Sequence, residues 1–145
     1  MSLPEPEPGL VIRYSYLWKA ESDLGREEGV KDRPCAIILR VDESGEDTIV
    51  TVVPITHSPP ANMRGAIEMP QMVKRRLGLD AEQSWFVLTE GNEFVWPGPD
   101  LRPPPGKDIA SVAYGFLPPA LFNAILARFI ALAKAGLAAR VRRTQ

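Results

Sequence analysis

The feature that most restricts the fold of this chain is a pair of apolar runs in its first half. Residues 34–41 (PCAIILRV) and 48–55 (TIVTVVPI) are separated by the polar segment DESGED. Two runs rich in β-branched residues, joined by a polar and turn-forming segment, predict a β-hairpin. Both runs are too continuously apolar for strands exposed on one side. We therefore expect strands that are buried on both faces or that belong to a closed barrel.

Weaker patterns indicate the elements around this hairpin. A C-terminal helix is expected over about residues 119–135, because apolar residues recur there at helical spacing, with prolines before them and Gly136 after them. The other elements are predicted in this order: a strand over 9–18, a long exposed loop over 19–32, a short strand over 66–69, a helix over 70–78, a strand over 84–90 that 92–96 continues or pairs with, and irregular structure over 97–106.

This order of elements predicts an α+β fold that is mainly β. We expect a small β-barrel over about residues 9–117 with an inserted helix, then the C-terminal helix, then a basic tail over 136–145. The length of 145 residues suits a single domain, since domains commonly contain about 100–150 residues.

Composition excludes several classes of protein and site. One cysteine allows neither a disulfide framework nor a cysteine-based zinc site, and the chain has no phosphate-binding glycine motif and no HExxH metalloprotease motif. No stretch approaches the roughly 20 apolar residues of a membrane helix. The beginning of the chain, MSLPEPEPG, is acidic and proline-rich, unlike a signal peptide. We therefore expect a cytoplasmic protein with no membrane partner.

Charge is unevenly distributed although the net charge is only −1. Residues 109–145 contain five basic residues and no acidic ones. Such a segment can bind a polyanion or an acidic protein, but we favour the simpler interpretation of a solvated helix end whose cations complement the helix dipole.

Polar residues at the ends of the hairpin strands are the best candidates for a site. Arg33 begins the first strand and Thr56 follows the end of the second, so antiparallel pairing brings them to one rim of the sheet. The loop that carries Glu28 precedes Arg33, and His57 follows Thr56. A guanidinium, a hydroxyl and an acid together suit a phosphate ligand. A surface ion pair between Glu28 and Arg33, and a turn-forming Thr56, are the simpler alternatives.

Three segments resemble the MazF/PemK family of toxin endoribonucleases. They are residues 9–12 (GLVI), 28–39 (EGVKDRPCAIIL) and 52–57 (VVPITH). The resemblance covers roughly residues 9–97, and the C-terminal helix matches in kind. It implies an SH3-like barrel that forms a homodimer and cleaves single-stranded RNA at short sequences without a metal or cofactor. It also implies an antitoxin protein that neutralises the toxin of a type II toxin–antitoxin system.

The resemblance also assigns residues. Arg33 and Thr56 match the catalytic arginine and threonine of the family, and Glu28 matches an acidic residue on the preceding loop. Arginine stays protonated, so Arg33 is suited to stabilise charge on phosphorus, whereas Glu28 or His57 can accept a proton. His57 can equally be a loop histidine that bonds to the backbone. The candidate RNA contacts are Lys31, Lys74, Arg75, Arg76, Asn92 and Trp96.

Two positions depart from the pattern of the family. Leu10 stands where family members have Asp, and the segment from Asn92 to Trp96 lacks the basic residue of the corresponding strand. These departures favour the alternative of a catalytically inactive SH3-like module that binds protein or nucleic acid. The tryptophans can stack on unpaired bases, but in a domain of this size they are more commonly core or interface residues.

Overall fold

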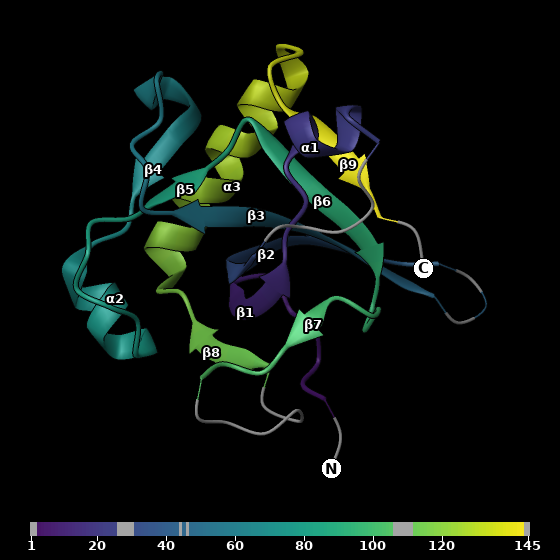
Figure 1. The fold of residues 1–145 in the computed structure, drawn as a ribbon, viewed down its shortest axis with the longest axis horizontal. Coiled ribbons are helices and arrows are strands. Elements are labelled where there is room, and N and C mark those ends of the chain that lie inside the picture. Colours follow the sequence, from purple (N-terminus) through teal and green to yellow (C-terminus); the bar gives the residue numbers. More distant parts are fainter. Residues whose placement is uncertain (1–2, 26–30, 44, 46, 106–111, 144–145) are drawn as a thin grey trace.

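The computed structural model describes residues 3–25, 31–43, 45, 47–105 and 112–143. These residues form an α+β fold in which one mainly antiparallel sheet is accompanied by three α-helices (Figure 1), and the predicted fold class is confirmed at this level. The strands are β1 (Leu10–Ser15), β2 (Asp32–Asp42), β3 (Thr48–Thr56), β4 (Ala66–Glu68), β5 (Trp85–Val87), β6 (Glu90–Val95), β7 (Leu101–Arg102), β8 (Ala113–Phe116) and β9 (Ala139–Arg142). The helices are α1 (Lys19–Asp23), α2 (Gln71–Leu77) and α3 (Pro119–Lys134).

The predicted hairpin is confirmed as the antiparallel pair β2 and β3. Cys35 pairs with Pro54, and the register shifts once, between Ile37 and Leu39. When the register of Cys35 and Pro54 is continued by two residues, Arg33 faces Thr56. The hairpin therefore brings the two residues to the same end of the sheet, as the sequence predicts.

Strand β2 is buried on both faces over residues 35–38, which confirms the prediction for the middle of its apolar run, whereas Val41 at the end of the run is exposed. Ala36 and Ile38 pack into one core with Ile125 and Phe129 of α3. Helix α2 adds to the same core, and Figure 1 shows α3 running behind β3 and β5. The alternate residues of β2 pack into a second core on the opposite face, together with apolar side chains of β1, β3, β6 and β7.

Several predicted elements differ from the structure, and one of them is the segment predicted as irregular over 97–106, which contains strand β7. The loop over 19–32 begins with a short helix, α1, because the side chain of Glu21 accepts a hydrogen bond from the Trp18 amide and caps the first turn. The strand predicted over 84–90 ends at Val87 as β5, and the segment 92–96, predicted to continue it or pair with it, falls largely in the separate strand β6. Phe86 pairs with Ile55 whereas Asn92 pairs with Val52, so more residues separate these two pairings on the β5–β6 segment than on β3.

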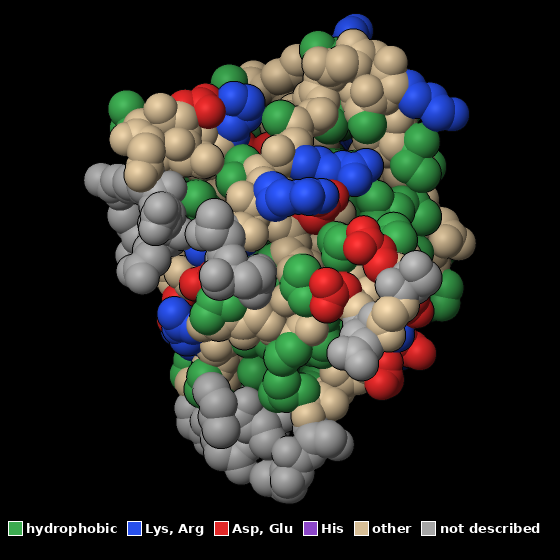
Figure 2. Space-filling view, turned by 90° about the vertical axis from the view of Figure 1, so that its right-hand side faces the viewer, with side chains coloured by type: hydrophobic (Ala, Val, Ile, Leu, Met, Phe, Trp, Pro, Cys, Tyr) green, Lys and Arg blue, Asp and Glu red, His purple; other side chains and the backbone are tan. Residues whose placement is uncertain are grey.

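The basic tail also differs, because it forms strand β9, which pairs in parallel with β6. On the face that carries these strands, Lys and Arg side chains gather beside acidic ones (Figure 2). Arg140 and Arg142 form ion pairs with Glu93 at 3.2 and 2.6 Å. The positive charge of the tail is therefore partly balanced within the fold.

Candidate functional site

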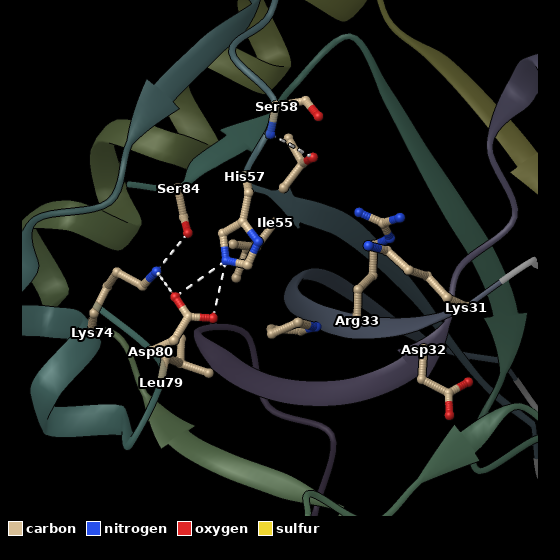
Figure 3. A pocket seen from close by; sticks show the side chains of 12 residues that line it. Lys31, Asp32, Arg33, Ile55, His57, Ser58, Lys74, Leu79, Asp80 and Ser84 are labelled. Atoms are coloured by element: carbon tan, nitrogen blue, oxygen red, sulfur yellow. Dashed lines mark hydrogen bonds and ion pairs between the residues drawn. The ribbon is translucent and has the colours of Figure 1, made fainter. Parts of the chain in front are cut away.

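A hollow opens where β2 begins and β3 ends, and Figure 3 shows its lining. Arg33 and Lys31 lie on one side of it, and His57, Lys74 and Asp80 lie on the other. The hollow measures about 190 Å³, which is below the range of about 300–1,000 Å³ for small-molecule sites. It is therefore better suited to one charged group of a longer ligand than to a whole cofactor.

Arg33 enters this hollow with an unused donor. Its Nε atom is buried, and no described residue accepts a hydrogen bond from it. The guanidinium lies 5.0 Å from the ring centroid of Trp18, a cation–π contact that leaves the N–H groups around the edge of the guanidinium available. A buried donor without an acceptor is costly and uncommon in native proteins. A ligand oxygen at this place would satisfy it.

Thr56 contributes a hydroxyl to the same hollow. Its Oγ1 atom accepts a hydrogen bond from the Ser58 amide at 3.2 Å, which fixes the turn after β3. Because the oxygen acts as the acceptor in this bond, the hydroxyl proton remains available to a ligand.

His57 is held against two carboxylates on the opposite wall. Its Nε2 atom lies 3.0 Å from Asp80 Oδ2, and its Nδ1 atom lies 3.6 Å from Glu82 Oε2. The residue is therefore part of an exposed ionic cluster, which excludes the reading of His57 as a loop histidine engaged only with the backbone. Ligand atoms of these three residues lie within 4.8 Å of one another, close enough for one cation.

Lys74 occupies the interior of this cluster. Its side chain is 2% exposed, and its Nζ atom donates to Asp80 Oδ1 at 2.7 Å, to Ser84 Oγ at 2.6 Å and to the carbonyl oxygen of Glu82. Partial burial raises the pKa of Asp80, but the hydrogen bond from Lys74, the Glu82 amide and the charge of His57 together hold that pKa below its ordinary value. One oxygen of Asp80 thus already has an ammonium partner.

Strand β6 holds Trp18 in its place over Arg33. Asn92 Oδ1 accepts a hydrogen bond from the Leu17 amide, and Asn92 Nδ2 donates to the Leu17 carbonyl, both at 2.8 Å. Glu90 accepts from the Lys19 amide at 2.9 Å. The side chains of Asn92 and Glu90 thus form hydrogen bonds with the backbone on both sides of Trp18, in place of the backbone hydrogen bonds of a paired strand. They fix the ring that shields the guanidinium.

The structure brings together five of the predicted site residues, which all line the hollow: Lys31, Arg33, Thr56, His57 and Lys74. Glu28 lies outside the described residues. Trp18 completes the surroundings of Arg33, but sequence reasoning missed that role. No local pattern indicates it, because the side chains that bond the backbone at Leu17 and Lys19, on either side of Trp18, come from residues more than 70 positions away.

The other predicted RNA contacts lie elsewhere. Arg75 and Arg76 are exposed on α2, and Arg76 borders a separate hollow beside Phe116. Asn92 is fully buried, and both polar atoms of its side chain are bonded within the protein. Trp96 is half-buried beside Phe94, with a distance of 6.2 Å between ring centroids. We therefore assign Asn92 a positioning role instead of a contact with a ligand.

In the described part of the chain, no helix is long and apolar enough to cross a membrane. No protein-family model matches the sequence, and no curated protein matches it.

Proposed function

We propose that this protein is an endoribonuclease that cleaves single-stranded RNA without a metal ion. The observation that carries the proposal is the buried, unpartnered Nε of Arg33 in a hollow that it shares with Thr56. Guanidinium groups bind phosphate oxygens bidentately and retain their charge, which suits the stabilisation of a phosphorane-like transition state.

The chemistry needs no external nucleophile. The 2′-oxygen of the RNA attacks the neighbouring phosphorus, the bond from phosphorus to the 5′-oxygen breaks, and a 2′,3′-cyclic phosphate and a 5′-hydroxyl are formed. Arg33 stabilises the negative charge that builds on the non-bridging oxygens, and Thr56 donates a hydrogen bond to one of them. The proton of the 2′-hydroxyl passes to a base and a proton is delivered to the leaving 5′-oxygen.

Two residues are proposed for these proton transfers. His57 can release or accept a proton at the wall of the hollow, where Asp80 and Glu82 orient its ring. Glu28 is the other candidate, on the basis of the family resemblance.

We further propose that the sheet is an SH3-like barrel and that the protein is the homodimeric toxin of a type II toxin–antitoxin pair. The support for the barrel is the second core, where β1, β2, β3, β6 and β7 pack their apolar side chains together. The dimer and the antitoxin partner rest on the resemblance of residues 9–12, 28–39 and 52–57.

The test is cleavage of a long unstructured RNA in excess EDTA. The parent protein should cut at a few short sites and leave cyclic phosphate ends, whereas Arg33→Ala should be slower by roughly 10²-fold or more, the scale of losing one donor to a developing charge. Arg33→Lys should fall between them, because it keeps the charge but loses the bidentate fork.

Arg40→Ala is the matched control for this experiment. Arg40 lies near the other end of β2 and pairs with Glu5 and Asp42, so the parent rate should be retained. If the parent protein leaves the RNA intact, or if Arg33→Ala cuts as fast as the parent, the nuclease proposal fails. An intact RNA that is nevertheless bound would favour the inactive binding module.

A further inference from the structure

Arg33 borders two further hollows besides the one described above. One contains Trp18, Thr56, Ser58, Pro59 and Pro60. The other contains Arg13, Tyr114 and Pro105 together with the residues next to Arg33 on β2. Three hollows thus border one residue, so a ligand longer than a single phosphate would extend from the hollow at Arg33 into one or both of its neighbours.

Beside the hollow that contains Arg13, two arginines share one carboxylate. Arg13 and Arg102 lie next to each other on paired strands β1 and β7. They share one carboxylate, Asp32, at the long distances of 3.9 and 3.8 Å. Asp32 can offset one of these cations, while Asp80, which also borders the hollow, has Lys74 as its own partner.

Arg13 is placed to act on a different part of the ligand from Arg33. Arg13 of β1 pairs with Pro34 of β2, and the next residue of β1, Tyr14, pairs with Arg33. Because side chains alternate between the faces of a sheet, Arg13 and Arg33 project from opposite faces near the beginning of β2. A single phosphate cannot be gripped by both, but consecutive phosphates of a chain that passes around this end of β2 can.

We propose that the hollow between Arg13 and Tyr114 is a second backbone subsite for single-stranded nucleic acid, and that it binds a phosphate flanking the one at Arg33. Arg13 supplies the charge, and Tyr114 forms the neighbouring wall with an aromatic ring beside the path of the chain. The inference rests on the proposed nuclease function for its substrate class, but it concerns binding and does not require cleavage.

The experiment measures binding of a fluorescently labelled 2′-O-methyl RNA of mixed sequence, which cannot be cleaved through its 2′-oxygen, by anisotropy at several salt concentrations. Losing one phosphate contact to a single strand should reduce the slope of log K against log salt by about 0.7. We expect this reduction for Arg13→Gln, with affinity several-fold weaker at low salt. Arg13→Lys should keep the slope of the parent protein, and so should the control Arg40→Ala.

Cleavage of ordinary RNA separates this subsite from the catalytic group. Arg13→Gln should raise KM and leave kcat within about twofold, because its contact is the same in the ground state and the transition state. If Arg13→Gln is folded by circular dichroism and binds with the parent slope, the subsite is overturned while the nuclease proposal stands. If the parent binds but does not cleave, the nuclease proposal fails and the slope still decides the subsite. A parent protein that does not bind the RNA at all overturns both.

Discussion

Replacing Lys74 with alanine should lower the free energy of unfolding by about 2–3 kcal/mol. Breaking a buried ion pair by removing one partner typically costs about 3–5 kcal/mol, and the half-exposed position of Asp80 places this case below that range. The substitution also removes the donor to the buried hydroxyl oxygen of Ser84, whereas the Glu82 carbonyl keeps the Ser84 hydroxyl as a donor. The measurement is urea unfolding followed by tryptophan fluorescence.

Two further variants test whether the stabilisation by Lys74 comes from its polar contacts. Lys74→Met keeps most of the aliphatic stem but removes the ammonium, so a loss close to that of Lys74→Ala would assign the energy to the polar contacts. Arg75→Ala, the exposed neighbour on α2, should change stability by less than about 0.5 kcal/mol. A loss below 0.5 kcal/mol for Lys74→Ala itself would contradict the buried network.

Replacing Arg143 with alanine should have the largest effect on stability, a loss of about 3–5 kcal/mol. Its side chain is 1% exposed and lies 3.1 Å from Asp100 in an ion pair that is itself largely buried. It also donates to the Ser15 carbonyl at 2.7 Å and to Asn92 Oδ1 at 3.1 Å. The variant leaves the Asp100 carboxylate without this partner and frees the end of β9.

Arg142→Ala is the matched control, because it removes the same type of residue one position earlier. Arg142 is exposed and its partner Glu93 keeps a second ion pair with Arg140, so the loss of Arg142 should cost no more than about 1 kcal/mol. Chemical unfolding of both variants gives the comparison directly. Equal effects at the two positions would show that the buried contacts of Arg143 contribute little.

The parts of the fold that the sequence predicts well are those determined by neighbouring residues. The β2–β3 hairpin follows from two apolar runs and a polar turn, and α2 ends at Gly78 because its left-handed conformation, with φ of 73°, suits glycine. The convergence of Arg33 and Thr56 follows from the hairpin alone. That much of the candidate site is a local consequence of the chain.

The parts that the sequence does not predict depend on contacts between distant residues. Lys74 belongs to the run Lys-Arg-Arg and is predicted to contact RNA, yet the loop after α2 folds back and brings Asp80 and Ser84 into contact with it. Asn92 reads as a surface residue of a ligand-binding strand, whereas its amide bonds the Leu17 backbone. In each case hydrogen-bond geometry, which residue type alone does not encode, determines whether the polar group faces solvent or the interior.

The position of β1 has a consequence for the way the chain reaches this structure. β1 pairs with β2, β7 and β8, and Arg143 closes onto Ser15 across a separation of 128 residues. Closing such long loops lowers the conformational entropy of the chain before the stabilising contacts between the distant segments have formed. Proteins dominated by such distant pairings fold in about milliseconds to seconds, more slowly than helical bundles of similar size. We therefore expect the pairing of β1 with its distant partners to limit the rate of refolding.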